Sequence, residues 1–402
     1  MPRTTAPKSA RRRIGSWAAA LIFGAGVAGA GAWWFSPAGA LPEGVTPADY
    51  HTATRQFERI NHRSAARNDV FSFLGEQAVT VERLALAADC FAEIPSDDPR
   101  YGRSARLQQA QVLLRLNRAY AAEQNFREFL TLAAAERAAE PAHIAAAARW
   151  LSYILSVELR FEDRKPVLAA MHRRGQADML DSKQYHFPSL LIWNSPAGRR
   201  RLMEFLKADP ANPQLRCAQG RYLTADGQFD AARALLEELF RQFPPRLDCA
   251  AALLECLFES HDLPEFTKVA QTLPGYAAGE PWLLTRLRGE LAMQLGQAEQ
   301  ALAYFQHVLA ADPANPLCQM GLSRAWAALH RPAERAQALN RSLVLSRIRV
   351  GLVKVNDNTY KSAAELAAEC DQAGLSEAAE TFRRHALQFR SASESVTDHE
   401  QP

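Results

Sequence analysis

Six cysteines are the most reactive side chains in this sequence, and their spacing argues against both a disulfide framework and a metal site. They are Cys90, Cys217, Cys249, Cys256, Cys318 and Cys370. The closest pair, Cys249 and Cys256, lies about two turns apart on one predicted helix, and a separation of ~10 Å exceeds the reach of a disulfide. We therefore predict buried, reduced thiols, even though their number is even.

No short catalytic motif accompanies these cysteines. The sequence contains no Cys-x-x-Cys, no His-Glu-x-x-His, no Gly-x-Ser-x-Gly and no phosphate-binding loop. His51 and His62 fall on predicted helix faces that face solvent, and the carboxylates mostly lie one helical turn from Arg or Lys or in a turn. We accordingly predict a protein that is not an enzyme, with no cofactor and no bound metal.

The positive charge is concentrated at the N-terminus. The formal net charge is +3, but residues 1–40 carry five basic residues and no acidic one, which leaves 42 basic and 44 acidic residues elsewhere. A nucleic-acid partner is therefore not expected. Two basic clusters remain, at 172–174 and 199–201. They predict exposed helix ends near a C-terminal dipole, with an anionic partner or lipid headgroup as the alternative.

An uncharged stretch of twenty-two residues, 14–35, follows the cytoplasmic basic segment 1–13. It would span ~33 Å as a helix, which is enough to cross the hydrocarbon core. Arg11–Arg13 before it and Trp33-Trp34 at its far end predict a signal anchor, with the remaining chain beyond the inner membrane, in the periplasm. The alternative is a signal peptide cleaved after Ala40, which would release a secreted or periplasmic protein.

The glycines within 14–35 match the dinucleotide-binding pattern G-x-G-x-x-G at 24–29, but a strand context is missing, so the match is accidental. Small residues spaced four apart, such as Gly24 and Ala28, would instead allow close helix approach and a homodimer through this segment.

A regular ladder of apolar or small residues dominates the rest of the chain. Its members are Phe57, Phe91, Phe126, Leu168, Leu202, Leu236, Ala270, Phe305, Leu339 and Phe382. Seven of the nine steps are 34 or 35 residues long, and the other two are 42 and 43. A period near 34 is typical of stacked helix pairs, so we predict an all-α solenoid.

The repeat resembles the tetratricopeptide repeat (TPR), in which a small residue at position 8 meets an Ala at 20, an aromatic residue or Leu at 24 and a Pro at 32. These columns hold Gly75, Ala87, Phe91 and Pro99; Gly220, Ala232, Leu236 and Pro244; and Gly289, Ala301, Phe305 and Pro313. A fourth unit has Ala110, Ala122 and Phe126 without the proline, and Asp-Pro-Ala-Asn-Pro occurs at both 209–213 and 312–316. The resemblance implies a right-handed superhelix of about nine helix pairs over residues 48–390. Residues 36–47 would be a linker and 391–402 a disordered tail.

The pattern weakens between residues 149 and 202, where Arg164 and Gly198 replace the expected Ala. An insertion near 133–142 predicts a longer helix, and a second one, 344–360, predicts a break before a capping helix pair. The order of units is also similar to TPR regions that precede FG-GAP/UnbV-like propellers in some exported bacterial proteins, although no propeller is present.

The resemblance further implies a concave groove lined by the first helices of the repeats. Its side chains would be Gln111, Arg115, Arg221, Arg286, Glu290, Gln294 and Arg324. Because Arg binds carboxylates through two hydrogen bonds, these residues favour an acidic peptide or chain terminus as the partner.

Taken together, the patterns predict a membrane-anchored TPR scaffold that binds proteins on the extracytoplasmic side. Two alternatives remain: a periplasmic assembly factor or chaperone for envelope complexes, and a non-catalytic subunit of an enzyme complex.

Overall fold

The structure is a computed structural model that describes residues 41–42, 44–135, 140–190, 195–243, 246–277, 279–354 and 360–398. The chain divides into two units, Met1–Leu41 and Pro42–Pro402, and every described helix lies in the second. Among the described helices, none combines the length and apolarity needed to cross a bilayer. The predicted anchor, residues 14–35, lies outside the described residues.

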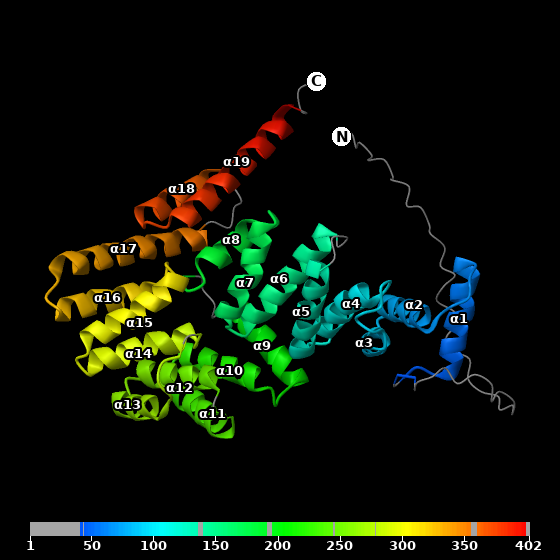
Figure 1. The fold of residues 1–402 in the computed structure, drawn as a ribbon, viewed down its shortest axis with the longest axis horizontal. Coiled ribbons are helices and arrows are strands. Elements are labelled where there is room, and N and C mark those ends of the chain that lie inside the picture. Colours follow the sequence, from blue (N-terminus) through cyan, green and yellow to red (C-terminus); the bar gives the residue numbers. More distant parts are fainter. Residues whose placement is uncertain are drawn as a thin grey trace, which may run out of the picture. The chain divides into compact units, whose positions relative to one another are not determined.

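The described part of the second unit is entirely α-helical, which confirms the predicted fold class (Figure 1). Its helices are α1 (Pro47–Asn61), α2 (Arg67–Thr80), α3 (Leu84–Ala92), α4 (Gly102–Arg115), α5 (Ala119–Ala135), α6 (Pro141–Val157), α7 (Phe161–Arg173), α8 (Met179–His186), α9 (Pro196–Ala208), α10 (Pro213–Ala225), α11 (Phe229–Gln242), α12 (Leu247–Glu259), α13 (Leu263–Thr272), α14 (Trp282–Gln294), α15 (Ala298–Ala311), α16 (Pro316–Ala328), α17 (Pro332–Lys354), α18 (Tyr360–Gln372) and α19 (Ser376–Asp398).

The repeated Asp-Pro-Ala-Asn-Pro motif marks two helix starts. Asn212 caps α10 by accepting hydrogen bonds from the amides of Gln214 and Leu215, and Asn315 caps α16 by accepting one from the amide of Cys318. A proline follows each Asn at the first helical position, where its fixed φ suits the helix and its missing N–H costs nothing. The identical motifs therefore start equivalent first helices of two repeats.

The small residues predicted at repeat position 8 meet the large residues at position 24. A Cβ atom on Gly75 would lie 2.6 Å from the Phe91 ring, and one on Gly289 would lie 2.6 Å from the Phe305 ring. A Cβ on Gly220 would likewise lie 2.5 Å from the Leu236 side chain. A Cβ at any of these positions would overlap a buried side chain, so the glycines allow the two helices of a repeat to approach closely.

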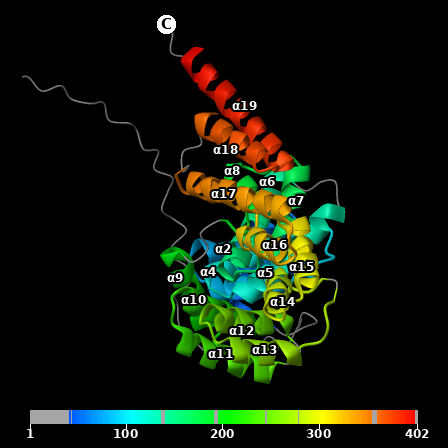
Figure 2. The same cartoon turned by 90° about the vertical axis from the view of Figure 1, so that its left-hand side faces the viewer.

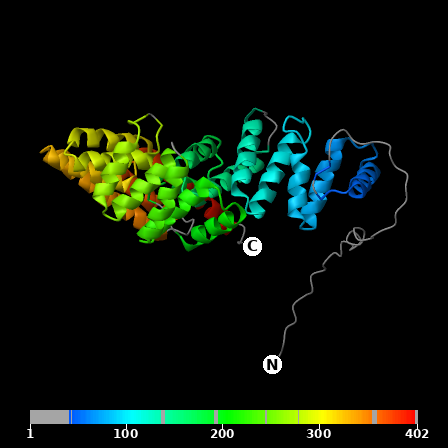
Figure 3. The same cartoon turned by 90° about the horizontal axis from the view of Figure 1, so that it is seen from below.

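Most consecutive helices pair as the repeat requires. The packed pairs are α2 with α3, α4 with α5, α6 with α7, α10 with α11, α12 with α13, α14 with α15, α16 with α17, and α18 with α19. Figure 3 shows the pairs from α2 to α7 standing side by side. We call the pairs from α2 to α7 the first block of repeats and those from α10 to α17 the second block. In the second block the first helices α10, α12, α14 and α16 also pack on one another.

The degenerate region 149–202 departs from this pairing. α8 packs on α7 and on α19, whereas α9 packs on α6 and α10, so α8 and α9 do not form a repeat. Phe187 and Leu190, just after α8, belong to a hydrophobic core with Leu345 and Ile348 of α17 and residues of α18 and α19. Hydrogen bonds between Ser182 and His385 (2.8 Å) and between His186 and Thr381 (3.2 Å) join α8 to α19. The segment from α8 to Leu190 is thus part of the C-terminal core (Figure 2).

The C-terminal region ends in a helix pair, α18 and α19, where the sequence predicts a capping pair. The preceding helix, α17, continues to Lys354 and α18 begins at Tyr360, so one helix ends and the next begins inside the predicted insertion; residues 355–359 lie outside the described part of the chain. The last described helix, α19, is amphipathic and extends to Asp398, into the predicted tail 391–402.

Candidate binding cavity between the first helices

A cavity of about 860 Å³ opens among the first helices of the second block. Its walls come from α10, α12 and α14, from the N-terminal ends of α7 and α16, and from the loop before α7. A volume of this size is within the range of ligand pockets, and the concave side of a repeat stack is where such proteins usually bind.

Arg221 of α10 and Arg286 of α14 both line this cavity, and Glu255 of α12 lies between them. The Arg221 guanidinium contacts the Glu255 carboxylate at 2.8 Å and donates a hydrogen bond to the carbonyl oxygen of Leu159 at 3.1 Å. Arg286, with a side chain only 6% exposed, lies 4.0 Å from the same carboxylate. The two arginines predicted to bind a partner therefore share the Glu255 carboxylate, which offsets one of their two positive charges.

The other predicted groove residues lie outside the cavity wall. Arg324 forms a two-point ion pair with Glu290, which is 4% exposed, at 2.5 and 2.7 Å. Arg115 of α4 contacts Glu82 at 2.5 Å, well away along the chain in the first block. Gln111 and Gln294 are exposed.

The wall formed by the start of α7 carries further paired charges. Arg160 contacts Glu158 at 2.8 Å, Glu123 at 2.6 Å and Asp163 at 2.6 Å. Glu162 accepts a hydrogen bond from the amide of Trp282, which satisfies one of the open N–H groups at the start of α14. Burial raises the pKa of Glu158 and of Glu162, each to about 7, because the low-dielectric wall disfavours their charged forms.

Apolar side chains complete the cavity. Trp282 and Leu283 at the start of α14, together with Phe161, contribute half-buried surface. Leu317, the second residue of α16, is 51% exposed and also lines the cavity. An exposed leucine at the rim of a concave site is typical of a contact surface for an apolar side chain.

The cavity has no surplus positive charge, because its lining holds four arginines and six carboxylates: Glu158, Glu162, Asp163, Asp248, Glu255 and Glu259. Its lining arginines, 160, 221, 246 and 286, each lie against a carboxylate of the protein. The acidic partner expected from the sequence is not supported, because a new carboxylate would have to displace one already bound.

The basic cluster at 199–201 also differs from the prediction. Ser195 caps α9 and Pro196 begins it, so these arginines lie in the first half of the helix and not at its C-terminal end. Arg199 contacts Asp226 at 2.6 Å, and Arg201 binds both Glu204 and the carbonyl oxygen of Leu114. These bonds tie α9 to neighbouring helices. By contrast, His172 and Arg173 do lie in the last turn of α7.

Glu255, Trp282 and Leu317 were not predicted as site residues. One signal in the sequence could have revealed Glu255, because it follows Arg221 by 34 residues and Arg324 likewise follows Glu290 by 34. Opposite charges one period apart lie on adjacent first helices, where an ion pair between repeats can form.

Comparison with known proteins supports the repeat assignment in one segment. Residues 223–286 match the tetratricopeptide repeat family. No match was found among curated proteins. These residues run from the end of α10 to the first turn of α14 and include α12, a wall of the cavity.

Several solved structures show weak likeness. A tetratricopeptide repeat protein from Parabacteroides merdae is 10% identical with a TM-score of 0.31, over 69% of this chain and 99% of that one. The human IFIT1 dimer with m7Gppp-AAAA is 11% identical with a TM-score of 0.36, over 85% of this chain and 94% of that one. The APC/C hetero-tetramer Cut9-Hcn1 is 13% identical with a TM-score of 0.33, over 86% of this chain and 78% of that one. These values are too low to support any inference about a ligand. The family match shows that residues 223–286 of this chain are similar to tetratricopeptide repeats.

Proposed function

We propose that this protein is a non-catalytic scaffold that binds an extended segment of a partner protein in the cavity walled by α10, α12 and α14. The observation that carries the proposal is the cavity itself, on the concave face of tetratricopeptide repeats, with an exposed leucine at its rim. Repeat stacks of this kind present long concave surfaces suited to peptides.

The chemistry of the wall favours a segment with apolar side chains and a basic group. Leu317, Trp282 and Leu283 provide apolar contacts, and Glu259 is an exposed carboxylate on the wall. The arginines are held by internal ion pairs and shape the wall.

Leu317→Arg is expected to weaken peptide binding about ten-fold or more, because it places a charge where an apolar side chain docks. The probe is a peptide selected on the wild-type protein from a random display library and then measured by fluorescence anisotropy. Leu295→Arg is the matched control, since Leu295 is 49% exposed but does not line the cavity. Equal affinities for the two variants would overturn the proposed site.

The second unit is proposed to lie on the extracytoplasmic side of a membrane, held by residues 14–35. The support is the sequence alone: an uncharged stretch long enough to cross a bilayer, directly after three arginines.

Cell fractionation with N-terminal sequencing of the purified protein tests this placement. We expect the full-length chain in the membrane fraction, extracted by detergent and not by high salt or alkaline carbonate. A soluble protein whose first residue is Leu41 would show that the segment is a cleaved signal peptide.

A further inference from the structure

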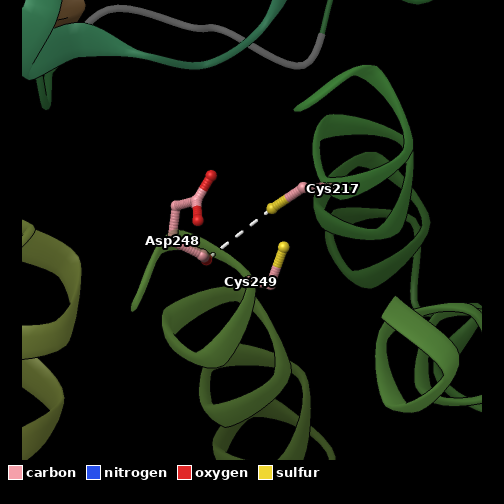
Figure 4. A group of neighbouring side chains, drawn as sticks. All are labelled: Cys217, Asp248 and Cys249. Carbon is pink, nitrogen blue, oxygen red and sulfur yellow. Dashed lines mark hydrogen bonds between the residues drawn. The ribbon is translucent and has the colours of Figure 1, made fainter. Parts of the chain in front are cut away.

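Two cysteines and a carboxylate converge at one edge of the cavity (Figure 4). Cys217 extends from α10, and Asp248 and Cys249 extend from the first turn of α12. The two sulfur atoms and a carboxylate oxygen of Asp248 all lie within 4.8 Å of one another. Tetrahedral zinc, with Zn–S bonds of about 2.3 Å, separates its sulfur ligands by about 3.8 Å. The distances between the three ligand atoms would therefore need to shorten by only ~1 Å for zinc to bind.

The repeat architecture brings these residues together. Cys217 and Cys249 occupy first helices of neighbouring repeats, α10 and α12, which pack directly on each other. The Cys217 thiol already donates a hydrogen bond to the Asp248 carbonyl oxygen at 3.6 Å. Such a site cannot be recognised from a short local motif, because its ligands come from separate repeats.

The charges around the group match a divalent cation. When both thiols are deprotonated, two thiolates and the Asp248 carboxylate carry three negative charges, and the Arg246 guanidinium carries one positive charge. The net charge of −2 would be neutralised by one divalent ion, as a buried site requires. Arg246 donates hydrogen bonds to both carboxylate oxygens of Asp248, to Oδ1 at 3.1 Å, and would hold that carboxylate in place, as outer-shell groups commonly do at metal sites.

Cys249 is the third residue of α12, and the N-terminal end of a helix favours a thiolate.

The group is accessible from the cavity. Cys217, Asp248 and Arg246 all line it, so an ion can enter and a fourth ligand can approach from that side. A site with three protein ligands and one open position is the usual arrangement where zinc binds water or an external group.

We propose that Cys217, Asp248 and Cys249 form a binding site for one thiophilic divalent cation of the zinc class, with its fourth coordination position open to the cavity. The site is independent of the proposed peptide-binding function, because its evidence is the convergence of ligands and not the repeat family.

Titration of the reduced, chelator-treated full-length protein with Co²⁺ tests the site, because a thiolate-bound cobalt ion gives ultraviolet charge-transfer bands and tetrahedral visible bands. We expect the bands to saturate at one equivalent of Co²⁺ and to be displaced by Zn²⁺. Cys217→Ser and Cys249→Ser should remove most of the charge-transfer intensity. Asp248→Asn should retain it but weaken affinity for the ion by about 10- to 100-fold.

Cys256→Ser and Cys318→Ser are the matched controls, since both cysteines are buried and outside the group. They should bind Co²⁺ like the wild type, and circular dichroism should show that every variant keeps its helical content.

Wild-type protein without thiolate-dependent bands would overturn the proposal. So would bands that persist in the Cys217→Ser/Cys249→Ser double variant. Loss of peptide binding in Leu317→Arg with normal Co²⁺ binding would separate the two sites.

Discussion

Phe305→Ala is expected to lower the free energy of unfolding by about 3–5 kcal/mol, which is the usual cost of deleting a buried aromatic ring. Phe305 is fully buried in α15 and packs against glycines of two first helices. A Cβ on Gly289 of α14 or on Gly321 of α16 would lie 2.6 Å from its ring, so both glycines contact the ring directly and have no side chain that could fill the cavity left by Ala. Urea denaturation followed by circular dichroism measures the loss.

A double-mutant cycle separates this packing from a general effect of substitution. Gly289→Ala should destabilise by about 1–3 kcal/mol through overpacking. Combined with Phe305→Leu, it should cost less than the sum of the two single changes, because the smaller side chain makes room for the new methyl group. Leu295→Ala, at an exposed position, should change stability by less than about 0.5 kcal/mol. Additive effects of the two core changes would contradict the close contact.

The repeat columns were predictable because they depend on local spacing. A small residue sixteen positions before a large one is needed whenever two helices of a repeat approach closely, and Gly289 with Phe305 shows this contact in the structure. The helix starts at Asn212 and Asn315 were also encoded locally, by an Asn-Pro sequence. Such features need no knowledge of distant contacts.

The binding cavity was only partly predictable. The columns placed Arg221 and Arg286 on first helices, and both line the cavity. Their shared ion pairing with Glu255 depends on contacts between repeats, which the spacing within one repeat does not reveal. The convergence of Cys217 with Cys249 was not predicted for the same reason, since the two residues lie in separate repeats and form no short ligand motif.

The degenerate middle was harder still, because its partners are far away in the sequence. Arg164 stands where the repeat expects Ala, yet its side chain is buried and donates hydrogen bonds to Ser156 Oγ and to the carbonyl oxygen of Gln184. Through the bond to Gln184, Arg164 connects α7 to α8, which does not follow the repeat pattern. The sequence showed that the repeat pattern is lost in this region, but not that Phe187 and Leu190 pack in the C-terminal core.

Phe187→Ala is expected to destabilise the C-terminal helices by about 3–5 kcal/mol. Phe187 is fully buried, and its ring stacks on that of Phe382 with 5.8 Å between centroids and an interplanar angle of 4°. The same core contains Leu345 of α17 and Leu366 of α18. Hydrogen exchange measured by mass spectrometry should show faster exchange in α18 and α19, with α10 to α15 unchanged, because repeat stacks lose structure locally.

Leu387→Ala provides the control, since Leu387 lies on α19 but is 64% exposed. If it leaves exchange unchanged while Phe187→Ala accelerates it, the stability of the cap depends on the residue after α8 and not on α19 alone. Unchanged exchange in α18 and α19 of Phe187→Ala would mean that the cap is stable without this contact.

The expected result follows from topology. A terminal helix pair in a solenoid has one neighbouring repeat only, and Phe187 and Leu190 supply α18 and α19 with a second apolar surface from the middle of the chain.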